Sequence, residues 1–140
     1  AEVQRDSVVV QSKAKLRRRV VFVTAKPRLC STLTQLVLNA NPNLFAPQEL
    51  YLLQCFTMDE RRRRLTGAGL DGWILEGLRK AVMELRDCDA SAASIILQKL
   101  DTLDTRQVYD LLQTWAGERI VIDKTPPYMW SKGTLQRAQD

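Results

Sequence analysis

The stretch VVFVTAKPRLCSTLTQLVLNANPNLFAPQELYLL, from Val20 to Leu53, decides the fold. It begins with apolar, mostly β-branched residues, which is typical of a strand buried on both faces of a parallel sheet. Pro27 ends this strand because proline has no N–H to give to the sheet. Ser31 or Thr32 then caps a helix whose apolar residues recur at helical spacing. The stretch therefore predicts a strand, a turn and a helix.

The rest of the chain is predicted to be mostly helical, with one more strand. Capping residues mark where helices begin, and Gly117 stands where a glycine C-cap belongs. The residues Ile120–Ile122 form a second strand of the buried type, followed by a turn rich in proline. The predicted helix starts are Thr57 with Glu60, Ser91, Asp104 with Gln107, and Ser131, and a long helix carries Ile74, Leu75, Leu78, Val82 and Leu85.

Length and composition favour a small globular protein. The chain has 140 residues, of which 45% are apolar, and a net charge of +5. It therefore fits one domain with a useful core. Residues 19–140 are expected to form that domain, and residues 1–18 to be a linker or an appended extension. No apolar run approaches the roughly 20 residues that span a bilayer, and no secretion signal is seen, so we expect a cytoplasmic protein.

The absence of some residue types excludes several functions. The chain has no histidine, the commonest general base near neutral pH and the commonest metal ligand. Its three cysteines have no metal-ligand spacing, so we expect no metal site and no disulfide framework. Aromatic residues make up only 6% and are not interleaved with the basic runs, so nucleic-acid binding is not favoured.

The turn between the first strand and the first helix has the position of a phosphate-binding loop. Free backbone N–H groups and the helix dipole favour an anion there. Lys26 or Arg28 would pair with its charge, and the hydroxyls of Ser31 and Thr32 would donate to its oxygens. The turn is not a Walker A sequence, and an ordinary strand–turn–helix with a serine cap stays an alternative.

Several ordered motifs resemble one enzyme family. The stretch from Phe22 to Met58, with RIVIDKTPPY further on, resembles a sulfotransferase domain of the kind embedded in modular polyketide synthases. The sulfate-donor loop of that family reads approximately Pro-Arg-Ser-Gly-Ser/Thr-Thr-Leu. The likeness continues through the Asn-Pro-Leu-Phe, Pro-x-Glu-Leu and Ile-Asp-Lys-x-Pro-x-Tyr motifs. The loop residues that match are Pro27, Arg28, Ser31, Thr32 and Leu33.

The resemblance implies a fold and a cofactor. We expect a truncated P-loop-like sulfotransferase fold of the α/β class, predominantly helical with a small parallel sheet. The family uses 3′-phosphoadenosine-5′-phosphosulfate (PAPS) as sulfate donor. By this likeness Lys26, Arg28, Ser31 and Thr32 would form a vestigial loop for the 5′-phosphosulfate. Glu49 would take part in catalysis, with Tyr51 at the position of the expected base.

Departures from the family pattern suggest lost activity. Cys30 replaces a glycine that lets the backbone approach the phosphosulfate closely. Tyr51 replaces a histidine, and a phenol is a poor base at neutral pH. The chain also ends before the Arg and Ser that bind the 3′-phosphate in the family. We therefore expect no cofactor for this chain alone, with PAPS bound only if the domain is active.

Three hypotheses for the function follow, of which the third is a nucleotide or phosphate sensor that retains only the anion-binding turn. The first is a degenerate, non-catalytic sulfotransferase-like domain that acts as a structural or docking element in a modular polyketide synthase. The alternative is part of an active PAPS-dependent sulfotransferase that sulfates a carrier-bound polyketide hydroxyl. The expected partners are other synthase domains or an acyl carrier protein. Two strands are too few for a covered sheet, which makes a homo-oligomer a further possibility.

Two charged segments leave alternatives open. Asp123 and Lys124 follow the second strand and lie either at the sheet edge where α/β folds bind ligands or in a surface ion pair. The run Arg61–Arg64 either docks an acidic carrier protein or forms a solvated helix face.

Overall fold

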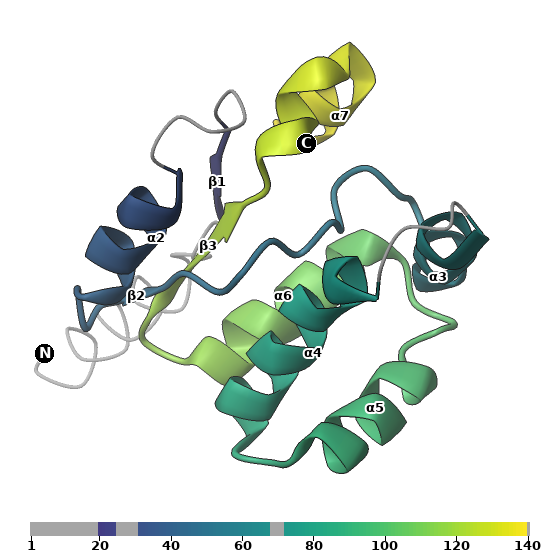
Figure 1. Ribbon diagram of the computed structural model, residues 1–140, viewed down its shortest axis with the longest axis horizontal. Coiled ribbons are helices and arrows are strands. Elements are labelled where there is room, and N and C mark those ends of the chain that lie inside the picture. Colours follow the sequence, from purple (N-terminus) through teal and green to yellow (C-terminus); the bar gives the residue numbers. More distant parts are fainter. Residues whose placement is uncertain (1–19, 25–30, 68–71, 140) are drawn as a thin grey trace, which may run out of the picture.

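The core of the structure is a three-stranded parallel sheet. A computed structural model describes residues 20–24, 31–67 and 72–139. The strand order is β1-β3-β2, with β3 (Ile120–Lys124) in the centre. The strand β1 (Val21–Val23) pairs with the end of β3, and β2 (Leu44–Phe45) pairs with its beginning. Figure 1 shows the sheet beside α2, with the other helices around it.

The predicted fold class is confirmed, and the count of two strands is corrected. The structure is an α/β arrangement that is predominantly helical around a small parallel sheet. The third strand, β2, comes from the chain itself, so no partner is needed to supply it. It has only two residues and thus no alternation of side chains that a sequence pattern could reveal. The predicted extension at residues 1–18 lies outside the described residues.

Most of the predicted helix boundaries are confirmed. Asp104 and Gln107 form the predicted capping box, and Gly117 follows α6 with a φ of 63°. The predicted cap at Ser91 is wrong, because Asp89 accepts the bond from Ala92 N instead. The helices are α2 (Ser31–Asn39), α3 (Met58–Gly67), α4 (Trp73–Arg86), α5 (Ala90–Lys99), α6 (Thr105–Ala116), the 3₁₀ helix η1 (Pro126–Trp130) and α7 (Lys132–Arg137).

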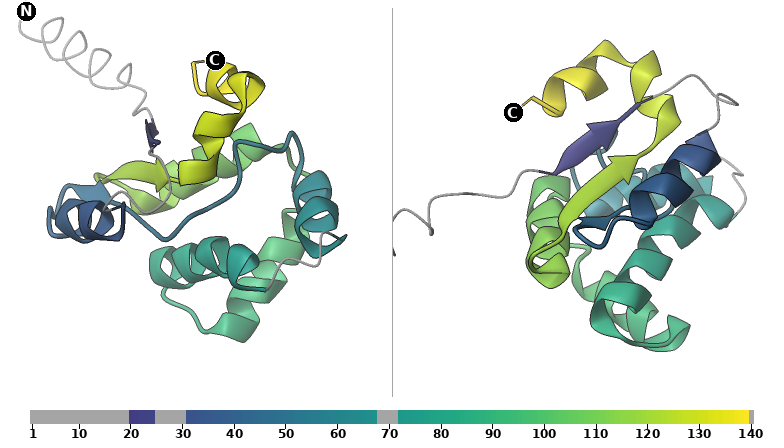
Figure 2. Two further views of the ribbon diagram at one scale, coloured as in Figure 1. Left: turned by 45° about the horizontal axis from the view of Figure 1, so that its top comes forward. Right: turned by 90° about the vertical axis from the view of Figure 1, so that its left-hand side faces the viewer.

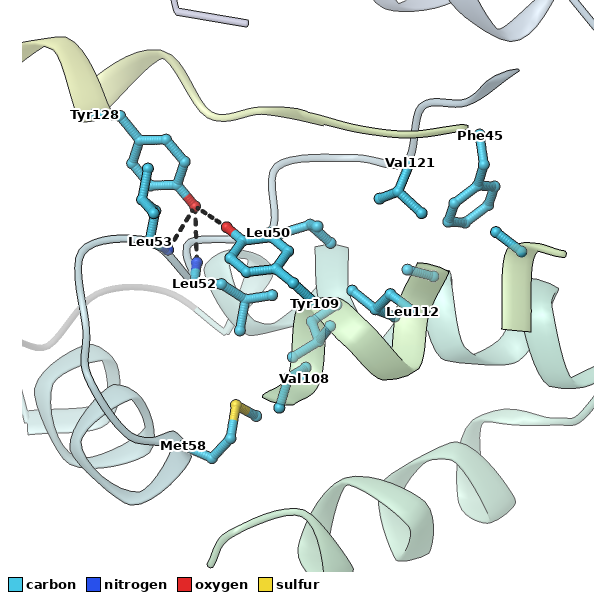
Figure 3. Packing of buried hydrophobic residues seen from close by; sticks show 13 residues of the cluster. Phe45, Leu50, Leu52, Leu53, Met58, Val108, Tyr109, Leu112, Val121 and Tyr128 are labelled. Atoms are coloured by element: carbon cyan, nitrogen blue, oxygen red, sulfur yellow. Dashed lines mark hydrogen bonds between the residues drawn. The ribbon is translucent and has the colours of Figure 1, made fainter. Parts of the chain in front are cut away.

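The apolar core lies between the sheet and the helical layer. The helix α6 contacts β3 on one side and α4 on the other, and α4 contacts α5 in turn. Figure 2 shows this helical layer below the sheet, with α7 on the far side of the strands. The core cluster draws Phe45, Val121 and Leu112 together from β2, β3 and α6 (Figure 3).

The helix α2 presents an apolar face that the described residues leave uncovered. Leu33, Leu36 and Val37 are each more than three-fifths exposed. The helix that carries them was predicted from their spacing and is confirmed. A contiguous exposed apolar face of this kind marks a surface that another element can cover.

Gly77 sets how closely the coil after β2 approaches α4. A Cβ atom built on Gly77 would lie 2.0 Å from the carbonyl oxygen of Glu49. This atom belongs to the backbone and cannot swing aside. A side chain at position 77 would therefore push Glu49 away from the helix.

We predict that Gly77→Ala lowers the free energy of unfolding by about 1–3 kcal/mol, because the added methyl group overpacks a rigid contact. Gly72→Ala is the matched control, since a Cβ atom there meets nothing within 4 Å. Urea denaturation of both variants measures the difference. Equal stability of the two variants would contradict the close contact at Gly77.

Candidate functional site

The segment from Glu49 to Leu53 is neither helix nor strand, yet its backbone N–H groups form hydrogen bonds with side chains. The hydroxyl of Tyr128 accepts hydrogen bonds from the N–H groups of Leu52 and Leu53 at 2.8 and 3.1 Å (Figure 3). The hydroxyl of Thr125 accepts from the N–H groups of Leu50 and Tyr51 at 3.2 and 3.4 Å. Residues just beyond β3 therefore fix the path of this coil.

Asp123 orients both of these hydroxyls. Its side chain is fully buried and accepts hydrogen bonds from Thr125 at 2.7 Å and from Tyr128 at 2.9 Å. Tyr109 of α6 donates a further bond to the same carboxylate. Burial raises the pKa of Asp123, while the three hydroxyls and the charge of Arg61 act in the opposite direction.

Arg61 binds the carbonyl groups of the same coil. Its Nη2 donates to Leu50 O at 2.7 Å, and its Nε lies within 3.2 Å of Leu50 O and 3.1 Å of Tyr51 O. The side chain is only 4% exposed, and burial lowers its pKa. We call Asp123, Thr125, Tyr128 and Arg61 the clamp, because together they bond both the donors and the acceptors of the coil.

The clamp places Glu49 and Tyr51 side by side. The Tyr51 hydroxyl donates a hydrogen bond to Glu49 Oε2 at 2.7 Å. The buried ammonium group of Lys124 lies 3.9 Å from Glu49 Oε1. Tyr51 has a φ of 51°, an uncommon conformation for a residue with a side chain, and such strain often occurs at functional sites.

Burial and the neighbouring carboxylate make Tyr51 a very weak acid. Removal from solvent raises the pKa of its phenol above the ordinary value, and the hydrogen bond to Glu49 raises it further. The hydroxyl therefore stays protonated at neutral pH and acts as a donor. It does not supply a base.

A pocket of about 230 Å³ brings several predicted site residues together. Thr32 from α2 lines it, as do Glu49, Tyr51, Gly77 and Lys124. This cluster lies at the carboxyl end of β3, where open α/β sheets bind ligands. Glu49, Tyr51 and Thr32 are therefore neighbours in the fold, although their roles stay predictions.

The remaining predicted loop residues are not placed. Lys26, Arg28 and Cys30 lie outside the described residues. Ser31 begins α2, but its side chain is not described. Whether the turn binds a phosphate thus stays a prediction.

The predicted solvated alternatives are wrong at three positions. Asp123 and Lys124 are buried, so they do not form a surface ion pair. Arg61 is buried in the clamp, and only Arg62, Arg63 and Arg64 are on the solvated side of α3. These three are paired with carboxylates, Arg62 and Arg63 with Asp59 at 2.8 Å and Arg64 with Glu60 at 3.3 Å.

Sequence patterns did not reveal two residues that shape the site. Gly77 is a lone glycine inside a helical pattern, and such a glycine can signal a close backbone approach. Arg61 is the first residue of a basic run, so nothing local distinguishes it from its exposed neighbours. Arg61 is buried because it binds a coil that lies outside α3, and no pattern within α3 reveals that contact.

The described part of the chain has neither a cluster of metal ligands nor a helix suited to a membrane. No group of three or more Cys, Asp or Glu side chains there is arranged to hold a metal ion. None of the helices in residues 31–67 and 72–139 has the length and apolar content needed to cross a membrane.

Two solved sulfotransferase domains share the fold of this chain. The chain is similar to a solved sulfotransferase domain from the curacin biosynthetic pathway, with 34% identity and a TM-score of 0.80. It is also similar to the sulfotransferase domain of the Synechococcus PCC 7002 olefin synthase, with 30% identity and a TM-score of 0.79. These similarities confirm the resemblance that the sequence motifs indicated.

The chain spans less than half of these neighbours. Each match covers 86% of this chain but only 42% of the curacin domain and 43% of the olefin synthase domain. No protein-family model and no curated protein matches the chain.

The three tyrosines of the chain give a pH prediction. Burial raises the pKa of Tyr51, Tyr109 and Tyr128 above the ordinary value of 10.0. Because the pKa is higher in the folded state than in the unfolded state, the protonated phenols contribute to folding stability. That contribution is fully present below about pH 10 and is lost as the pH rises above it.

We predict that the folded chain shows almost no phenolate absorbance at pH 10, whereas the urea-unfolded chain is about half ionised. A spectrophotometric titration of both states measures this. Ionisation of one tyrosine equivalent below pH 10 in the folded chain would contradict the buried, bonded state of these phenols.

Proposed function

We propose that this chain is a non-catalytic sulfotransferase-like domain that serves as a structural or docking element in a modular polyketide synthase, in the cytoplasm. The observation that carries the proposal is the hydrogen bond from Tyr51 to Glu49. At the position where the family resemblance expects a base, the side chain is a proton donor with a raised pKa. A general base must instead be able to take a proton near neutral pH.

The state of Glu49 also supports this proposal. One of its carboxylate oxygens accepts from Tyr51, and the other faces Lys124. Both carboxylate oxygens therefore face side chains of the domain itself. The pair therefore behaves as an internal polar contact between the coil and β3.

We further infer that this chain alone does not bind PAPS tightly. Of the predicted cofactor residues, Thr32 lines the pocket that contains Glu49. The chain spans 42% of the curacin domain, so a cofactor site built over a whole domain would be present only in part. Each missing charge-assisted contact would remove about 1.5–3 kcal/mol of binding.

The docking part of the proposal rests on α2. Leu33, Leu36 and Val37 form an apolar face that the described residues do not cover. The basic residues of α3 are less suited to an acidic carrier protein, because Arg62, Arg63 and Arg64 already have carboxylate partners. We therefore favour an apolar contact with another synthase domain.

The alternative is an active fragment of a PAPS-dependent sulfotransferase acting on a carrier-bound hydroxyl. The observation that favours it is the pocket, in which Thr32, Glu49 and Lys124 meet at the carboxyl end of β3. In this alternative Glu49 would be the base, and it would have to release its bond with Tyr51.

One assay distinguishes the two functions. The chain is incubated with PAPS and a 3-hydroxyacyl thioester, and release of the desulfated nucleotide is followed. We expect no release above the background without protein, and no change in the Glu49→Gln variant. Turnover that is lost in Glu49→Gln but kept in Glu84→Gln, a matched change at an exposed carboxylate outside this pocket, would establish the alternative instead.

A further inference from the structure

A second pocket lies between α3, with the coil that precedes it, and α7. Its volume is about 530 Å³, within the range of roughly 300–1,000 Å³ that is common for small organic ligands. It shares none of its lining residues with the pocket at Glu49. In Figure 1, α3 and α7 come from distant parts of the chain. Its lining includes Phe56, Glu60, Arg64, Pro127, Ser131 and Arg137.

The charge on the α3 side of this pocket is balanced. Glu60 accepts from the N–H of Phe56 at 2.7 Å and pairs with Arg64 at 3.3 Å. The bond from Phe56 lowers the pKa of Glu60, so the carboxylate is ionised at neutral pH. Arg64 also donates to Gln54 O at 3.0 Å. These contacts fix Arg64 and Glu60 as one wall.

Arg137 supplies a positive charge that this wall does not neutralise. Its guanidinium lies 4.2 Å from the centroid of the Phe56 ring. Within the described part of the chain, its Nε is shielded from solvent and has no hydrogen-bond partner. Arg79 has a similar unpartnered Nε, but its guanidinium pairs with Glu76 at 2.6 Å. No described carboxylate pairs with Arg137 in this way.

Arg137 lines the pocket, and the terminal N–H groups of its guanidinium would donate to an anion there. Its Nε is shielded from solvent and takes no part in this contact. Arginine suits an oxyanion because its planar fork can donate two parallel bonds to phosphate oxygens. Ser131, whose Oγ accepts from Thr134 N at 3.2 Å, keeps its O–H to donate to the same group.

The apolar lining indicates that the anion is part of an organic molecule. Phe56 is 64% exposed, and Pro127 lies in the same lining. An inorganic ion would fill only a small part of the volume and would leave this ring in water. A ring or chain attached to the phosphate would instead cover Phe56.

We propose that this pocket binds an organic phosphate ester, with the phosphate on Arg137 and Ser131 and the organic group against Phe56. The proposal does not depend on whether the pocket at Glu49 is catalytic. It assigns a ligand class to a surface between α3 and α7 that neither the family resemblance nor the solved neighbours identify.

Phenyl phosphate is a suitable probe of the proposed site. Titration into the whole chain, followed by calorimetry and by the amide and arginine Nε signals in NMR, should give saturable binding with shifts at Phe56 and Arg137. Inorganic phosphate should bind more weakly, because it lacks the ring. Phenol should bind much more weakly, because it lacks the charge. Binding of phenol as tightly as phenyl phosphate would overturn the proposal.

Two arginine variants separate a specific site from general attraction to a basic protein. Arg137→Gln should weaken phenyl phosphate binding roughly tenfold or more, since it removes a charge-assisted bond. Arg63→Gln removes the same charge from α3, outside this pocket, and should leave the affinity within about twofold. Circular dichroism checks that both variants are folded.

Equal weakening by the two variants would overturn the site, because net charge alone would then explain the binding. Absence of saturable binding of phenyl phosphate to the unchanged chain would overturn it directly. If Arg137→Gln does not fold, Phe56→Ala provides the second test. That variant should reduce the preference for phenyl phosphate over inorganic phosphate, and an unchanged preference would contradict the role of the ring.

Discussion

The buried carboxylate of Asp123 is the interaction on which the arrangement around the site depends. It accepts bonds from Thr125 and Tyr128 and so fixes the hydroxyl oxygens that receive the backbone N–H groups of residues 50–53. Arg61 completes the clamp on the carbonyl side. A buried coil without such partners would leave its polar backbone groups unsatisfied, at about 1–3 kcal/mol each.

The clamp links the fold to the candidate site. The coil that it holds carries Glu49 and Tyr51, and β3, which ends at Lys124, provides the third side chain. Gly77 lets α4 pack against the carbonyl of Glu49 from the other side. The polar groups of the site are thus fixed by contacts from β3, α3 and α4 together. A rigid arrangement of this kind is compatible with catalysis. It is equally compatible with a structural role, in which Glu49 and Tyr51 are hydrogen-bonded to each other.

Patterns in the sequence predicted the regular part of the structure better than the site. The helices followed from apolar spacing and from caps such as Asp104 with Gln107, which are local signals. The strand β2 was missed because two residues carry no periodicity. The burial of Arg61 and Lys124, and the exposure of Leu33 on α2, depend on residues distant in the sequence. Only the family resemblance placed Glu49 and Tyr51 at a site, and it did not predict the hydrogen bond between them.

Amide hydrogen exchange at Leu50, Leu52 and Leu53 tests the clamp most directly. Ordinary coil amides exchange through small local openings. If the clamp holds this coil as part of the core, these three amides will exchange only on global unfolding, with the same protection as Leu78 and Val82 in α4. Exchange of Leu52 and Leu53 through local openings, much faster than that of Leu78, would contradict the account.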